Sequence, residues 1–193
     1  MNAMIVDSSA LTEQVVIDVL ASAFDSAGQR CSALRVLCLQ DEIADHTLKM
    51  LRGAMAECRM GNPGRLTTDI GPVIDSEAKA NIERHIQTIR SKGRQVFQPV
   101  RENSEDTREW QSGTFVAPTL IELDDFAELQ KEVFGPVLHV VRYNRNQLPA
   151  LIEQINASGY GLTLGVHTRI DETIAQVTGS AHVGNLYVNR NMV

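Results

Sequence analysis

The sequence has no apolar run close to the ~20 residues that cross a bilayer, and no charged segment precedes a signal-like hydrophobic stretch. It also lacks a block of lysine or arginine, because its formal net charge is −6 and residues of both signs are interleaved along the chain. These absences argue against a membrane segment and against contacts with a nucleic-acid backbone. We therefore expect a cytoplasmic domain that binds neither membrane nor nucleic acid.

Cysteine is scarce, with three residues at irregular spacing, so the sequence predicts no disulfide framework. Cys38 lies in the apolar run Ala33–Leu39, and Cys58 falls in phase with the apolar residues of a helix. Both positions are typical of core packing. The five histidines lie far apart and form no pair with the usual metal-ligand spacing, so we expect no metal.

Cys31 differs from the other cysteines because it lies between an amphipathic segment and an apolar one, in Gly28-Gln29-Arg30-Cys31-Ser32-Ala33. A thiol in an exposed loop beside an arginine and a hydroxyl can be held partly as thiolate. Cys31 is therefore the candidate nucleophile. Two alternatives stay open: a cysteine hydrolase, which needs a histidine base near the thiol, and a non-catalytic α/β interaction module whose cysteine is merely exposed.

Hydrophobic periodicity predicts strands that alternate with helices. Strands are expected at residues 3–6, 33–39, 96–98, 114–120, 137–141, 162–166 and 186–188. Helices are expected at 11–24, from a cap at Asp41 through 55, from a cap at Ser76 to 93, from a cap at Asn146 through 155, and from Asp171. The charged, aperiodic residues 101–112 are expected to form a surface excursion. The alternation indicates an α/β fold with a mainly parallel sheet flanked by helices.

Both ends of the chain have the character of internal segments. Strand character begins almost at Met1, and no closing helix or polar tail follows residue 189. We expect a domain truncated at both ends, and a small complete domain with short termini is the alternative. The hydrophobic content of 43% and the charged content of 22% fit a globular domain in either case.

Several turn motifs follow Cys31 in a definite order and together carry a resemblance to a known family. They are Gly61-Asn62-Pro63, Ile70-Gly71-Pro72-Val73-Ile74, Gly113-Thr114-Phe115-Val116-Ala117-Pro118-Thr119, Glu132-Val133-Phe134-Gly135-Pro136-Val137, Tyr160-Gly161-Leu162 and Gly184-Asn185-Leu186-Tyr187-Val188-Asn189. Over essentially the whole chain this order resembles the catalytic domain of the aldehyde dehydrogenase superfamily. The segment around Cys31 is more closely similar to the L-glutamate γ-semialdehyde (Δ1-pyrroline-5-carboxylate) dehydrogenase part of the bacterial proline utilization A family.

The resemblance implies NAD-dependent oxidation of a small aldehyde in proline catabolism, with Cys31 forming a hemithioacetal and then a thioester. It implies that Glu132 accepts hydrogen bonds from the nicotinamide ribose and that Phe134 packs beside the nicotinamide. It assigns Arg30 and Ser32 to the substrate carboxylate. The alternatives without a binding role are simpler. Glu132 would be a solvated residue before a turn and Phe134 a core aromatic. Arg30 would only favour the thiolate form of the neighbouring cysteine, and the Ser32 hydroxyl would bond to the backbone.

The resemblance also implies that residues 1–193 are the nucleophile-bearing fragment of a catalytic domain. The dinucleotide-binding domain, the water-activating glutamate that precedes a Gly-Gly pair, and the C-terminal tail would be absent. The isolated chain is then expected to be inactive, and the parent is expected to be a homo-oligomer that carries FAD only in a separate domain. An aldehyde dehydrogenase for a different aldehyde is the alternative within the enzyme class.

Overall fold

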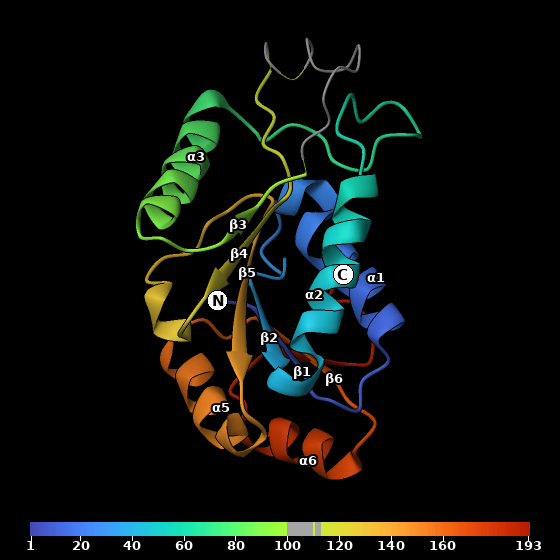
Figure 1. The fold of residues 1–193 in the computed structure, drawn as a ribbon, viewed down its shortest axis with the longest axis vertical. Helices are drawn as coiled ribbons and strands as arrows, with labels where there is room; N and C mark the ends of the chain where they lie inside the picture. The colour runs from blue at the N-terminus through green and yellow to red at the C-terminus, as the bar shows by residue number, and fades with distance from the viewer. Residues whose placement is uncertain (100–109, 111–112) are drawn as a thin grey trace.

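A computed structural model describes residues 1–99, 110 and 113–193 and contains a seven-stranded sheet flanked by helices (Figure 1). The strands are β1 (Ala3–Val6), β2 (Val36–Gln40), β3 (Val96–Phe97), β4 (Thr119–Leu123), β5 (Val137–Tyr143), β6 (Thr163–His167) and β7 (Asn185–Val188). Their order is β3-β4-β5-β2-β1-β6-β7, and every neighbouring pair is parallel except β3 and β4. The expected α/β fold with a mainly parallel sheet is confirmed.

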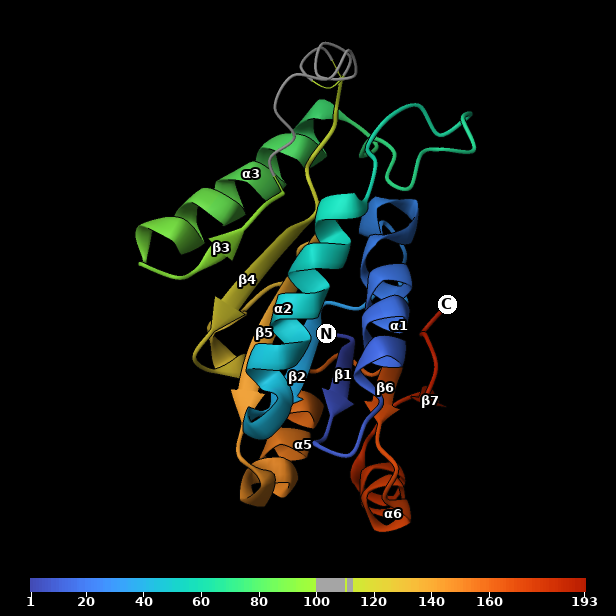
Figure 2. The ribbon, with the colours of Figure 1, turned by 45° about the vertical axis from the view of Figure 1, so that its right-hand side comes forward.

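The helices pack around the sheet. They are α1 (Thr12–Phe24), α2 (Asp41–Glu57), α3 (Ser76–Ser91), α5 (Leu148–Ala157) and α6 (Asp171–Ser180), with short 3₁₀ turns η1 (Asp25–Gly28), η2 (Phe126–Glu128) and η3 (Arg145–Gln147). Helices α1 and α2 lie side by side over one face, and α5 and α6 lie toward the carboxyl ends of the strands (Figures 1 and 2). Among the described segments, no helix is both long and apolar enough to pass through a bilayer.

The central strands explain the near-continuous apolar runs of the sequence. Every residue of β1, β2 and β6 is buried, as expected of parallel strands that are covered on both faces. Several buried polar side chains interrupt this core, and two of them concern the candidate site: Arg35, directly before β2, is 1% exposed, and His139 in β5 is 0% exposed. Because a buried polar group is costly without hydrogen-bond partners, these two residues require an explanation.

The predicted helices form, but their predicted caps are wrong. Asp41 lies inside the first turn of α2 and makes no capping bond, although a carboxylate there still complements the helix dipole. Asp75 rather than Ser76 caps α3, because its carboxylate accepts a backbone N–H at 2.7 Å. Asn146 lies within η3, which Asn144 caps. Asp75 and Asn144 are the capping side chains at α3 and η3, whereas no side chain caps the first turn of α2.

The strand predicted at residues 114–120 is displaced toward the C-terminus. Strand β4 begins at Thr119, because Pro118 has no N–H to give to a ladder. The segment before it pairs irregularly instead, with the Val73 N–H donating to the Thr114 carbonyl at 2.9 Å. The surface excursion expected at residues 101–112 lies outside the described residues except for Trp110, whose indole N–H donates to Met60 O at 3.1 Å.

A left-handed turn joins α1 to the cysteine loop. Ser26, Ala27 and Gly28 have φ values of 57°, 54° and 66°, so three successive residues adopt a conformation that costs most L-residues about 1–2 kcal/mol each. At Gly28 the packing is also tight, since an added Cβ would overlap the backbone of Gly135 and lie 2.8 Å from the Ala23 carbonyl oxygen. Glycine is therefore required at this contact between the loops before β2 and β5.

Gly28→Ala is expected to lower the free energy of unfolding by at least about 2 kcal/mol, because backbone strain and steric overlap add. Urea unfolding followed by circular dichroism measures this loss. Gly53→Ala is the matched control, because Gly53 lies in α2 with nothing within 4 Å of an added Cβ. That change is expected to stabilise the chain by about 0.5–1 kcal/mol. Equal effects of the two substitutions would contradict the proposed contact.

Candidate active site

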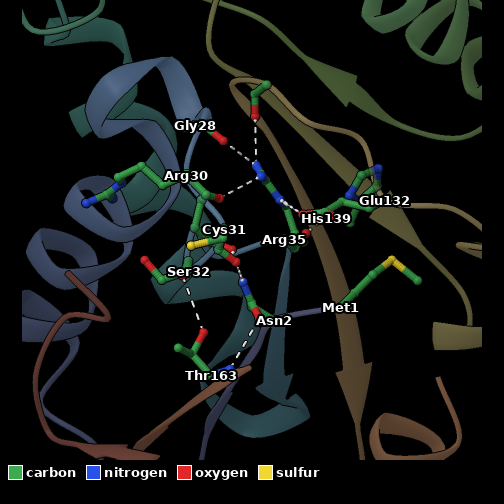
Figure 3. A network of polar contacts seen from close by, with 12 residues as sticks. Met1, Asn2, Gly28, Arg30, Cys31, Ser32, Arg35, Glu132, His139 and Thr163 are labelled. Atoms are coloured by element: carbon green, nitrogen blue, oxygen red, sulfur yellow. Dashed lines mark hydrogen bonds and ion pairs between the residues drawn. The ribbon is translucent and has the colours of Figure 1, made fainter. Parts of the chain in front are cut away.

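The candidate site lies at the amino ends of four adjacent strands, β5, β2, β1 and β6. Glu132 precedes β5, Cys31 precedes β2, Asn2 precedes β1 and Thr163 begins β6. Because these strands are parallel neighbours, residues that precede them meet at one edge of the sheet (Figure 3). Ligands of open α/β sheets usually bind at the opposite, carboxyl edge. A site at the amino edge therefore needs side-chain interactions that hold its loops in place.

Cys31 is the accessible thiol of the described chain. It is exposed in a turn closed by the Ala33 N–H donating to the Arg30 carbonyl at 3.2 Å. Cys38 is completely buried, and burial raises the pKa of its thiol to about 12. Cys58 is half-buried, as its predicted packing role requires. Within the described residues no histidine hydrogen-bonds the Cys31 sulfur.

The Arg35 side chain joins the cysteine loop to the loop before β5. Its Nη1 donates to Gly28 O at 2.7 Å and to Gly135 O at 3.2 Å, and its Nη2 donates to Arg30 O at 3.1 Å. Its Nε donates to Glu132 Oε1 at 2.9 Å. Burial lowers the pKa of Arg35, and the hydrogen bond and charge of Glu132 raise it. Each nitrogen of the buried guanidinium thus has at least one acceptor.

Glu132 and Phe134 line a cavity between α3 and residues 128–134 with a volume of about 720 Å³. The Glu132 carboxylate uses Oε1 for Arg35, and no described residue donates to Oε2. The Phe134 ring is 48% exposed, and its centroid lies 4.9 Å from the Arg35 guanidinium carbon. The two predicted cofactor residues therefore present a free carboxylate oxygen and an open ring face to one cavity.

Asn2 holds the other side of the cysteine loop. Its Nδ2 donates to Cys31 O at 2.7 Å and to Ala33 O at 2.9 Å, and its Oδ1 accepts the Thr163 N–H at 3.4 Å. The Thr163 hydroxyl donates to Ser32 O at 3.4 Å. Carbonyl oxygens of the loop are thereby turned toward the protein. The Cys31 N–H, in contrast, has no acceptor among the described residues.

Arg30 and Ser32 flank the thiol but differ in their partners. The Cys31 sulfur, the Ser32 hydroxyl and the Arg30 guanidinium extend to the same side, and the guanidinium reaches farthest (Figure 3). Nη2 of Arg30 donates to Ala21 O at 2.9 Å, at the end of that helix. The Ser32 hydroxyl has no partner in the described chain. Ser32 is thus placed to contact a ligand of Cys31, and the role of Arg30 in binding substrate stays a prediction.

Two histidines connect the cavity to the backbone of Arg35. His139 Nδ1 lies 3.2 Å from the Arg35 carbonyl oxygen, which can only accept, so Nδ1 carries the proton. His139 Nε2 must then accept from His85 Nε2 at 2.9 Å. Burial, together with the nearby charges of His85 and Arg35, lowers the pKa of His139 to about 3, and burial and Lys92 lower that of His85.

Sequence reasoning missed the roles of Arg35 and Asn2. A signal for Arg35 was present, because it is the only charged residue within the apolar run at 33–39, and a charge buried on both faces of a sheet needs a partner. Asn2 gave no comparable signal, since an asparagine before a strand is commonly solvated. Its role depends on the arrangement of β1, β2 and β6 in space.

Comparison with known proteins places this geometry in a family. The model of the aldehyde dehydrogenase family matches residues 1–193. The chain belongs to this family. The aldehyde dehydrogenase domain described here is 97% identical over 193 residues to bifunctional protein PutA of Escherichia coli, and 33% identical over 190 residues to 1-pyrroline-5-carboxylate dehydrogenase 1 of Halalkalibacterium halodurans. A crystal structure of bifunctional proline utilization A matches it with a TM-score of 0.91 and 47% identity.

These aldehyde dehydrogenase relatives are much longer than the chain. The matches cover 100% of the chain for the Escherichia coli protein and the crystal structure, and 97% for the Halalkalibacterium halodurans protein. The chain spans only 15%, 19% and 35% of their respective lengths. The predicted resemblance to the aldehyde dehydrogenase family is confirmed. Because the chain spans a small part of these relatives, their activity comes to it as a proposal.

Iodoacetamide is expected to alkylate Cys31 more than about 100-fold faster than Cys38 in the folded chain, because alkylation needs an accessible thiolate. Cys38 offers neither, since it is buried and its pKa is raised to about 12. Mass spectrometry of peptides after timed labelling measures both rates. Labelling in urea, which should equalise the two, provides the control. Equal rates in the folded chain would contradict the assignment of Cys31 as the accessible thiol.

The stability of the chain is expected to fall as the pH is lowered from 6.5 toward 3. Folded His139 stays neutral down to about 3, whereas the unfolded residue takes a proton near 6.5, so the unfolded state binds more protons in this window. One such group contributes a slope of up to about 1.4 kcal/mol per pH unit. Urea midpoints measured across the window should show a flatter dependence for His139→Gln. Parallel curves for the two proteins would refute this assignment.

Proposed function

We propose that residues 1–193 form the nucleophile-bearing catalytic part of an NAD-dependent L-glutamate γ-semialdehyde dehydrogenase that acts within a longer polypeptide. The supporting observation is the position of Cys31, an exposed thiol on the sheet edge that also carries Glu132 and Phe134. Membership of the aldehyde dehydrogenase family supports the reaction class. The similarity to proteins named PutA and 1-pyrroline-5-carboxylate dehydrogenase supports the substrate and a role in proline catabolism.

The cavity beside α3 fits the nicotinamide end of NAD. A ribose hydroxyl binds well to a charged acceptor, and Glu132 offers a carboxylate whose Oε2 is not used by the described residues. The exposed face of Phe134 is suited to packing against a flat ring. NAD, when bound, accepts the hydride released by the substrate carbon. Glu132 and Phe134 would orient the ring that receives it.

Cys31 performs the covalent chemistry in this proposal. Its Sγ adds to the aldehyde carbon, and the carbonyl oxygen becomes the oxyanion of a hemithioacetal. The Cys31 N–H, which has no acceptor in the described chain, donates to that oxygen. Loss of hydride from the carbon leaves a thioester. Water then cleaves the carbon–sulfur bond, so that the acid is released and the thiolate is restored.

The residues beside Cys31 receive the rest of the substrate. Its carboxylate needs a cation and hydrogen-bond donors, and we assign these to Arg30 and Ser32. The Ser32 hydroxyl is half-buried beside the thiol and has no partner among the described residues. The described acceptors of Arg30 engage only Nη2, so Nη1 can donate to an anion. The family pattern supplies the water-activating glutamate before a Gly-Gly pair, which this sequence does not contain.

The test is a chimera in which this chain replaces the matching region of the Escherichia coli relative. We expect NAD-dependent oxidation of glutamate γ-semialdehyde, with kcat/KM well above that for simple aliphatic aldehydes. Cys31→Ser should lower the activity at least about 1000-fold, because a hydroxyl is a far weaker nucleophile than a thiolate. NADH absorbance measures the rate of both proteins.

Cys58→Ser is the matched control, because a serine hydroxyl can keep the bond that the Cys58 thiol donates to Ala54 O. It should retain activity within about twofold. The isolated chain is expected to show no NAD-dependent turnover, since it has no Gly-Gly pair to carry the water-activating glutamate. A chimera that is active with Cys31→Ser, or a faster reaction with aliphatic aldehydes, would reject the proposed nucleophile or substrate respectively.

A further inference from the structure

The two functional loops meet at a backbone contact that one side chain spans. Gly28 and Gly135 touch through their backbones, and an added Cβ on either residue would overlap a neighbouring group. Arg35 Nη1 donates to the carbonyls of both glycines, at 2.7 and 3.2 Å. The guanidinium therefore sits in the seam between the loop that carries Cys31 and the loop that carries Glu132.

Each nitrogen of this guanidinium has a separate task. Nη2 fixes the carbonyl of Arg30, the residue next to the nucleophile, at 3.1 Å, and Nε fixes Glu132 Oε1 at 2.9 Å. The guanidinium carbon also lies over the ring of Phe134, 4.9 Å from its centroid. A planar guanidinium holds these partners at fixed relative positions, which no flexible chain of bonds would do.

We propose that Arg35 is a positioning residue that fixes the distance between the nucleophile and the nicotinamide ring. The proposal rests on the proposed function, because it takes Cys31 as the nucleophile and Glu132 and Phe134 as the cofactor residues. Arg35 holds the cysteine loop through hydrogen bonds to the backbone of residues 28–30. It holds the proposed cofactor residues through its contacts with Glu132 and Phe134. With Oε1 held, the Glu132 carboxylate is oriented before a ribose hydroxyl reaches Oε2.

Lysine cannot replace arginine in this position. Its ammonium has three donors at a single point, whereas the structure uses four donor contacts spread over the three nitrogens of Arg35. A lysine can keep a positive charge near Glu132 but cannot hold Gly28, Arg30 and Gly135 together with it. Arg35→Lys therefore keeps the charge and removes the fixed geometry.

The experiment uses the full-length chimera, with Arg35→Lys compared with the unchanged protein. We expect kcat to fall about 100-fold, because a displacement on the order of 1 Å between reacting groups costs that much. We expect KM for NAD to rise about tenfold, as the Glu132 carboxylate loses its orientation. Each kcat is divided by the fraction of protein whose buried Cys38 resists alkylation by iodoacetamide, so that unfolded molecules do not count.

Arg52→Lys is the matched control. Arg52 also pairs with a glutamate, Glu122, and lies 5.9 Å from an aromatic ring, that of Phe97, but it joins α2 to β4 away from the candidate site. Its replacement should leave the corrected kcat and KM within about twofold. If Arg35 were merely structural, Arg35→Lys would lower the folded fraction and leave the corrected kcat and the KM for NAD unchanged. That result would overturn the proposal.

A second variant covers the case in which Arg35→Lys does not fold. Glu132→Gln keeps a hydrogen-bond acceptor for Arg35 but removes the charge, so it should raise KM for NAD and also lower the corrected kcat. An effect on KM alone would show that Glu132 acts on the cofactor without the coupling proposed through Arg35. If the chimera that carries none of these substitutions shows no NAD-dependent activity, that result would instead reject the proposed function. The experiment thus distinguishes failure of the proposed function from failure of the proposal for Arg35.

Discussion

The geometry of the site depends on one buried cation. Arg35 is 1% exposed, and its charge is compensated by Glu132 and by three backbone carbonyls. A buried charge that loses one partner costs about 3–5 kcal/mol, so the loops cannot relax independently of the guanidinium. The ion pair requires the conformation of both loops, and both loops keep their conformation because of the ion pair. This mutual dependence extends the rigidity of the sheet into segments with no regular structure.

Asn2 completes this arrangement from the opposite side of the thiol. Arg35 binds carbonyls that precede Cys31, and Asn2 binds the carbonyls of Cys31 and Ala33. A loop whose carbonyls are held inward must turn amide groups outward, and the Cys31 N–H is left without a described acceptor. Donors fixed before substrate arrives need no reorganisation when charge develops. The polar core residues thus determine which backbone groups face the candidate site.

The elements of this fold could be predicted from periodicity, but their connections could not. The apolar runs predicted β1, β2 and β6 because fully buried parallel strands leave a strong pattern. Cap positions were missed because Asp75 and Ser76 are equally plausible in sequence, and only the backbone angles decide between them. The bonds from Asn2 to Cys31, and from Arg35 to Glu132, span 29 and 97 residues, and no local pattern encodes such pairs.

At the amino edge of the sheet, the positive charge of Arg30 offsets the partial negative charge at the end of α1. Helix α1 runs back from the carboxyl end of β1, so its last carbonyls, with their partial negative charge, lie beside the cysteine loop. This partial charge opposes a negative charge nearby. Arg30 Nη2 donates to Ala21 O at 2.9 Å and sets a full positive charge against the helix end, while Nη1 stays available. The guanidinium can serve both groups because Nη1 and Nη2 are separate donors on one delocalised cation.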